Sequence, residues 1–102
     1  MKNLDKYLET IKADYANWMA ADTDIRKKMV QEFNESVRVD EGSKYLKVVR
    51  SGGVHSFICK EDMGKFKKGD ILKAASWAAP AKNFARGNLI EGDFSKIRWT
   101  GA

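Results

Sequence analysis

The sequence has one cysteine, one proline and one histidine among its 102 residues. Because a disulfide needs two cysteines, Cys59 cannot form one within the chain, and a metal cage built from several cysteines of one chain is excluded as well. We therefore expect a protein of a reducing cytoplasm. The chain is 43% hydrophobic and 32% charged, a composition typical of a globular domain rather than a disordered tail.

A long uncharged hydrophobic run is also missing from the start of the chain. The opening stretch, MKNLDKYLETIKADY, carries a charge every few positions, whereas a signal peptide or a membrane span needs an uncharged stretch. We expect a soluble protein with no membrane partner. At 102 residues, the chain is long enough for one domain, covering residues 1–102, and too short for two.

The positive charge lies almost entirely in the second part of the chain. Residues 1–41 contain seven Lys and Arg against nine Asp and Glu, whereas residues 42–102 contain twelve against five. A cationic region of this kind attracts an anionic partner.

The apolar pattern of the first part predicts two helices. The first stripe begins after Asn3, a candidate N-cap, and stops near Ala21; its members are Leu4, Tyr7, Leu8, Ile11, Tyr15, Trp18 and Met19. Asp22 or Thr23 then offers a second cap, and the second stripe contains Ile25, Met29, Val30, Phe33 and Val37. Because no glycine or proline separates the stripes, a single bent helix is the alternative.

From Gly42 onward the period changes to that of strands. Residues 44–50 and 54–60 predict a hairpin around the turn Ser51-Gly52-Gly53, because glycine accepts a positive φ without steric cost. Further strands are predicted at residues 71–75 and 96–100, with a turn-rich connection at 61–70 and an ordered loop at 76–88. The fold class is therefore α+β: a helical part, residues 1–41, and a β-rich part, residues 42–102. We expect two N-terminal helices packed on a small, mainly antiparallel sheet of three to five strands.

No residue pattern in the sequence indicates catalysis, a cofactor or a metal. His55 and Cys59 lie on the same face of the predicted strand, but positions four apart are separated by roughly 13 Å, too far for a nucleophile and its base. We expect a core cysteine and a half-exposed histidine. The glycines match no phosphate-binding loop or dinucleotide fingerprint, and neither Ser51 nor Ser76 lies in a nucleophile elbow. We expect a protein that is not an enzyme.

The strongest candidate for binding is the segment KAASWAAPAKNFARGN, residues 73–88, which interleaves cations with aromatic rings. This mixture suits phosphates and stacked bases. The candidate binding residues, including two near the end of the chain, are Lys73, Trp77, Lys82, Phe84, Arg86, Asn88, Arg98 and Trp99. Lys65, Lys67 and Lys68 could extend the surface. The alternative is that the large aromatics are core residues and the cations are merely solvated.

The run VHSFICKEDMGKFKKGDILKAASWAAPAKNFARGNL resembles the C-terminal portion of the members of a group of small uncharacterised proteins encoded by tailed bacteriophages. The resemblance is carried by Val54, His55 and Phe57, by residues 69–82 with their A-S-W-x-A-P-A-K core, and by residues 86–88. It covers about a third of the chain and no activity comes with it. The resemblance implies a viral origin and a role in the cytoplasm of an infected bacterium.

Three functions remain as hypotheses. The first is a nucleic-acid-binding accessory protein that uses the basic β-rich part. The second is a protein-interaction module, such as a modulator of a host protein or a small assembly component, because tryptophan and arginine favour interface cores. The third is a pocket that sequesters an anionic small molecule among Lys73, Trp77, Lys82 and Arg86.

Overall fold

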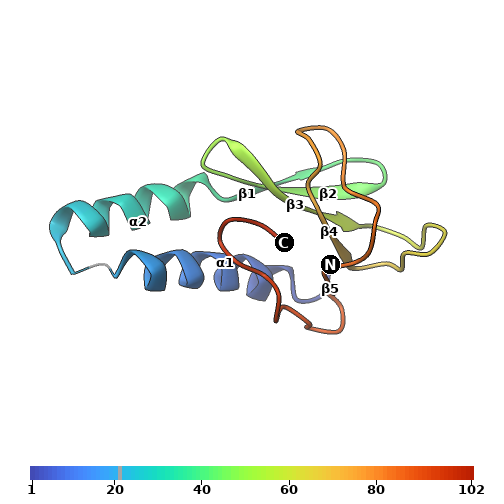
Figure 1. Ribbon diagram of the computed structural model, residues 1–102, viewed down its shortest axis with the longest axis horizontal. Helices are drawn as coiled ribbons and strands as arrows, with labels where there is room; N and C mark the ends of the chain where they lie inside the picture. Colours follow the sequence, from blue (N-terminus) through green and yellow to red (C-terminus); the bar gives the residue numbers. More distant parts are fainter. Residues whose placement is uncertain (21) are drawn as a thin grey trace.

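The computed structural model describes residues 1–20 and 22–102. Two helices are followed by one five-stranded antiparallel sheet (Figure 1), which confirms the predicted α+β class and its arrangement. The elements are α1 (Leu4–Met19), α2 (Asp24–Ser36), β1 (Arg38–Glu41), β2 (Tyr45–Arg50), β3 (Gly53–Cys59), β4 (Asp70–Lys73) and β5 (Gly87–Asn88).

The two helices are separate, so the alternative of a single bent helix is wrong. Helix α1 ends where Ala20 adopts a left-handed conformation, and the Ala20 N–H bonds the Ala16 carbonyl at 3.1 Å. Thr23, one of the two predicted caps, accepts a hydrogen bond from the Arg26 N–H at 3.2 Å and starts α2. The threonine hydroxyl thus satisfies an amide that would otherwise lack a partner in the first turn.

Asn3 does not cap α1 with its side chain, contrary to the prediction. Its backbone is left-handed, with φ of 67°, a conformation that asparagine tolerates better than most residues. The side-chain amide instead donates to the carbonyls of Leu89 and Ile90, at 3.0 and 3.2 Å. The start of α1 is therefore attached to the segment that follows β5.

The sheet has the order β1-β2-β3-β4-β5, and each strand is antiparallel to its neighbour. The predicted hairpin forms between β2 and β3, with Arg50 paired to Gly53. Its two turn residues, Ser51 and Gly52, both have positive φ, 47° and 76°. This is the turn whose twist matches that of a hairpin.

Three predictions about the strands are wrong. Strand β1 lies inside the part expected to be helical, and β5 lies at the end of the predicted loop. No strand forms at residues 96–100; within the described chain, that segment contains only a bridge between Arg98 and Gly101. The reason is that backbone groups of this segment bond side chains from other elements instead of a neighbouring strand.

The core lies between α1 and one face of the sheet (Figure 1). Its buried members include Tyr7, Ile11, Val48, Ile58 and Ile71. A smaller cluster, made of Phe57, Cys59, Phe66 and Leu72, is separate from this core. Cys59 is fully buried, as predicted, and burial raises the pKa of its thiol to about 11. Within the described residues, no helix is both long and apolar enough to cross a membrane.

Some apolar residues of the two predicted stripes do not reach the core. Trp18 is 65% exposed, Ile25 is 75% exposed and Met29 is 43% exposed. All three lie toward the end of the helical pair where α1 meets α2, and Figure 1 shows this end reaching beyond the sheet. Within residues 1–20 and 22–102, no strand lies at that end for these side chains to pack against.

Candidate nucleic-acid interface

A register irregularity in β3 sets the direction of its histidine. Val48 pairs with Ser56 but Val49 pairs with Val54, so His55 is the extra residue of a β-bulge. The bulge turns His55 toward α1, where its ring lies 5.9 Å from the ring of Tyr7. His55 and Cys59 therefore do not share a face, and His55 is 1% exposed rather than half-exposed.

A buried chain of hydrogen bonds runs from α1 through this bulge. The Tyr7 hydroxyl lies 2.6 Å from Ser56 Oγ, which lies 2.8 Å from His55 Nδ1. His55 Nε2 lies 2.6 Å from the carbonyl oxygen of Arg98. Because that carbonyl can only accept, Nε2 carries the proton and Nδ1 accepts from the Ser56 hydroxyl. Burial lowers the pKa of His55 to about 4, so the ring is neutral near pH 7.

Two further side chains hold the segment that follows Arg98. Arg50 Nε donates to the Trp99 carbonyl at 3.1 Å, and its Nη2 donates to the Thr100 carbonyl at 2.7 Å. The Trp99 N–H donates to Asp14 Oδ2 at 2.8 Å. Side chains from α1, β2 and β3 thus fix this segment, although it belongs to no strand.

The fixed segment forms one wall of a hollow of about 430 Å³, which we call the basic hollow. Four cations line it: Lys73 at the end of β4, Arg86 just before β5, and Lys96 and Arg98 near the end of the chain. Its other lining residues carry no acidic side chain; they are Val54, His55, Ala74, Thr100, Gly101 and Ala102. The hollow therefore concentrates positive charge.

These cations have few partners of their own. Within residues 1–20 and 22–102, the ion pairs involve Lys12, Arg26, Arg38 and Lys60, and none involves a cation of the basic hollow. Arg98 Nη1 donates to the Ile97 carbonyl at 3.0 Å. The Arg86 guanidinium lies 4.1 Å from the centre of the Phe84 ring, and its buried Nε has no partner in the described chain.

The two predicted aromatic residues of the loop at 76–88 are exposed, but only one of them contacts a residue that lines the basic hollow. Phe84 and Trp77 are both 51% exposed. Phe84 stacks on Arg86, a residue of the basic hollow. Trp77 instead lies under the ammonium of Lys47, at 4.6 Å from the ring centre.

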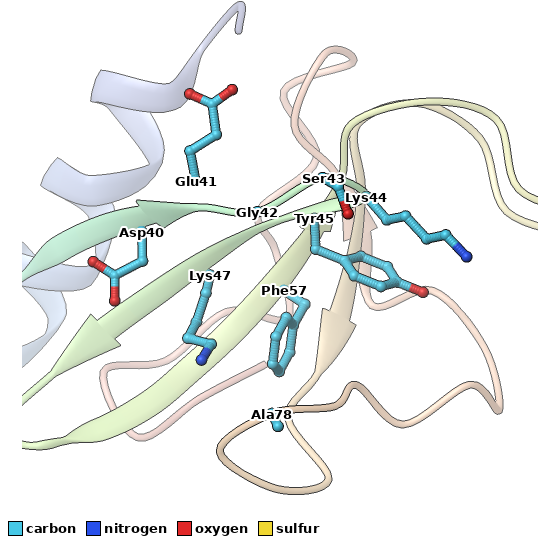
Figure 2. A pocket seen from close by; sticks show the side chains of 9 residues that line it. All are labelled: Asp40, Glu41, Gly42, Ser43, Lys44, Tyr45, Lys47, Phe57 and Ala78. Atoms are coloured by element: carbon cyan, nitrogen blue, oxygen red, sulfur yellow. The ribbon is translucent and has the colours of Figure 1, made fainter.

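Lys47 belongs to a second hollow, of about 370 Å³, next to β1 and β2. Figure 2 shows Lys47 and Phe57 extending from neighbouring strands toward the loop that carries Ala78. Its charges are mixed and its acidic residues are paired: Asp40 with Arg38 at 3.1 Å and Glu41 with Lys60 at 2.6 Å. Lys60 lowers the pKa of Glu41. This hollow offers a weaker attraction to an anion than the basic hollow.

The remaining predicted residues have different surroundings. The Asn88 side chain is buried, with Nδ2 2.9 Å from Asp70 Oδ1 and Oδ1 accepting from the Glu91 N–H at 3.0 Å, so it supports the fold locally. Lys82 is exposed and does not line the basic hollow. Trp99 is half-buried, 4.9 Å from the ring of Tyr15.

Sequence reasoning did not select two residues that the structure places near the site. Lys96 lies in a segment predicted to be a strand. The only sequence signal for its place in the basic hollow is the excess of Lys and Arg in the second part of the chain. Trp18 is a member of the first predicted helical stripe, and nothing in that pattern marks it as a binding residue. Its exposure depends on where α1 leaves the sheet, which the helical period does not specify.

A family model described as a family of unknown function (DUF7717) matches residues 1–101. No curated protein and no solved structure matches the chain. Within residues 1–20 and 22–102, no group of three or more histidine, cysteine, aspartate or glutamate residues is placed to hold a metal ion.

Proposed function

Because the chain belongs to the DUF7717 family, whose function is unknown, we propose a function from geometry: it binds nucleic acid, without catalysis, through phosphate contacts in the basic hollow. The observation that carries the proposal is the convergence of Lys73, Arg86, Lys96 and Arg98 on one hollow with no acidic side chain among its lining. Phosphate oxygens accept strong, charge-assisted hydrogen bonds from such groups.

The stacked pair beside the hollow supports nucleic acid over an isolated anion. Arg86 has its guanidinium over the Phe84 ring, and that ring is 51% exposed. An exposed ring next to phosphate-binding cations offers a surface for a base, since every base has a π-face. The resemblance to tailed-bacteriophage proteins adds the proposal that binding occurs in the cytoplasm of an infected bacterium.

The test is a fluorescence-anisotropy titration with labelled oligonucleotides at two salt concentrations. We expect affinity to fall steeply with salt, because binding releases the counterions of the phosphates. Lys73→Gln/Lys96→Gln should weaken binding and lower the salt slope by about 1.4 on a single strand or about 1.8 on a duplex, because two phosphate contacts are lost. Salt-independent binding, or none, would contradict the proposal.

A matched control is available on α2. Lys27→Gln/Lys28→Gln removes the same charge from two exposed side chains that lie far along the sequence from the basic hollow. We expect this variant to bind within about twofold of wild type, because local phosphate contacts outweigh net charge at moderate salt. Equal losses in both double variants would show that only the overall charge matters.

A second candidate function, a protein-interaction module, is favoured by the exposed apolar side chains of α2. Ile25 and Met29 lie one helical turn apart and are 75% and 43% exposed. Ile25→Ser/Met29→Ser should then lose partners that wild type captures from nuclease-treated bacterial lysate. If the same proteins are captured by both, this surface does not recruit them.

The third hypothesis, a pocket for an anionic small molecule, involves only part of its predicted residues at the basic hollow. Of the four residues expected to surround an anionic small molecule, Lys73 and Arg86 line the basic hollow, whereas Trp77 and Lys82 do not. A free nucleotide would have to bind the basic hollow itself. A thermal-shift titration with mononucleotides measures this directly, because a ligand of the folded state raises the melting temperature.

A further inference from the structure

The Trp18 side chain is exposed to solvent and also packs against other aromatic rings. It is 65% exposed, yet its ring centre lies 5.1 Å from that of Trp99 and 6.2 Å from that of Tyr15. Phe33 stacks against Tyr15 at 4.0 Å, so the cluster behind Trp18 is continuous with the core. The indole is therefore supported on one side and open to solvent on the other.

A hollow of about 570 Å³ lies beside this ring, and we call it the aromatic hollow. Trp18 and Trp99 supply its aromatic lining, and the side chains of Asp14, Asn17 and Thr100 supply polar groups. A flat ring next to hydrogen-bonding groups suits a nucleobase, which presents a π-face and a polar edge.

The aromatic hollow adjoins the basic hollow. Arg98 and Thr100 line both, so these two residues lie where the hollows meet. The contacts of Asp14, Arg50 and His55 hold the intervening backbone in place. A ligand can therefore occupy both hollows without rearranging the segment between them, which lowers the cost of binding.

We infer that the aromatic hollow is a base-stacking subsite, so that the protein binds single-stranded nucleic acid, with a base on Trp18 and neighbouring phosphates in the basic hollow. This inference rests on the proposed function and specifies its substrate. A duplex cannot use the subsite, because its bases are stacked and paired inside the helix. An unpaired strand presents its bases to an exposed aromatic ring.

The experiment compares three labelled probes of equal length in the same salt: oligothymidylate, an abasic strand with the same phosphates, and a blunt duplex. We expect wild type to bind oligothymidylate at least about 10-fold more tightly than the abasic strand, since one stacked base contributes a factor of about 5 to 150. Trp18→Ala should remove most of this difference, leaving the part that a base on the Phe84 ring supplies, and should leave the salt-dependent affinity for the abasic strand unchanged. Trp18→Phe should keep most of the difference.

Trp77→Ala is the matched control, because it removes an exposed tryptophan that lines neither hollow. It should keep the preference for oligothymidylate. If Trp18→Ala does not fold, as judged by its circular dichroism, Trp18→Phe and the three probes on wild type decide the question.

Three outcomes separate this inference from the proposed function. Wild type that binds the abasic strand or the duplex as tightly as oligothymidylate overturns the base-stacking subsite but leaves phosphate binding in place. A folded Trp18→Ala that keeps the full preference also overturns it, and assigns the exposed ring to another contact, such as an apolar protein segment. Absence of salt-dependent binding to all three probes refutes the proposed function itself.

Discussion

His55 Nε2 lies 2.6 Å from the carbonyl oxygen of Arg98, a residue 43 positions away along the chain. The β-bulge in β3 gives the ring this direction, and the Ser56 hydroxyl at Nδ1 fixes its tautomer. The bond attaches the segment that separates the two hollows to the sheet. A protonated ring still donates from Nε2, but it no longer accepts the Ser56 hydroxyl at Nδ1. Protonation of His55 should therefore break the buried chain of hydrogen bonds at Ser56.

We predict that the protein loses stability as the pH falls from 6.5 to 4. Burial lowers the pKa of His55 to about 4, so over this window the unfolded state binds a proton that the folded state does not. The free energy of unfolding should decrease by about 2 kcal/mol between pH 7.5 and pH 5 from this residue alone. Urea unfolding followed by circular dichroism at several pH values measures the decrease.

His55→Gln separates this effect from the titration of carboxylates. The glutamine cannot be protonated, so the variant should be less stable at pH 7.5 but nearly independent of pH between 7.5 and 5. If wild type and His55→Gln show the same pH dependence over that interval, His55 is not the group responsible.

Cys59 should be unreactive in the folded protein. Its side chain is fully buried and burial raises the pKa of its thiol to about 11, whereas the reactive species is the thiolate. With a disulfide reagent at pH 8, we expect the native thiol to react at least about 100-fold more slowly than in denaturant. A fast reaction of the native protein would mean that the cluster around Cys59 opens readily.

The parts of the fold that could be predicted are those governed by local sequence. The helix period over residues 4–19 spans several turns, and Thr23 is a strong capping residue. The hairpin follows from Ser51 and Gly52, which accept the positive φ of a two-residue turn. Strands β1 and β5 are four and two residues long. Strands this short do not show a recognisable alternation of apolar and polar residues.

The candidate site depends on contacts between residues far apart in sequence. The segment after Ile97 reads as a strand, yet its backbone bonds the side chains of Asp14, Arg50 and His55. Of the predicted binding residues, Lys73, Arg86 and Arg98 come together at the basic hollow, whereas Trp77 and Asn88 serve other contacts. Charge in a sequence predicts an anionic partner, but only tertiary packing decides which cations meet.

Gly87→Ala should destabilise the pairing of β4 with β5. A Cβ at position 87 would overlap the carbonyl oxygen of Asp93 and touch Ile71 Cδ1 at 3.5 Å, so the backbone must shift. We expect a loss of about 1–3 kcal/mol in the free energy of unfolding, measured in urea. Gly42→Ala, at an exposed position where the nearest atom is 3.2 Å from the added Cβ, should cost less than about 1 kcal/mol. Equal costs would show that β5 adapts to the added methyl group.

Arg50→Lys should lower both the stability of the protein and its preference for oligothymidylate over the abasic strand. The arginine bonds two successive carbonyls, those of Trp99 and Thr100, at 3.1 and 2.7 Å. A lysine keeps the charge but cannot reproduce this planar fork, so we expect a loss of about 1–2 kcal/mol in the free energy of unfolding. The backbone of Trp99 should then be held less firmly beside Trp18, and the preference for oligothymidylate should fall, as measured by anisotropy.

Arg38→Lys is the control, because Arg38 forms an exposed ion pair with Asp40, and such pairs contribute less than about 1 kcal/mol. If Arg50→Lys matches Arg38→Lys in both measurements, the two carbonyl bonds neither stabilise the segment nor position the aromatic hollow.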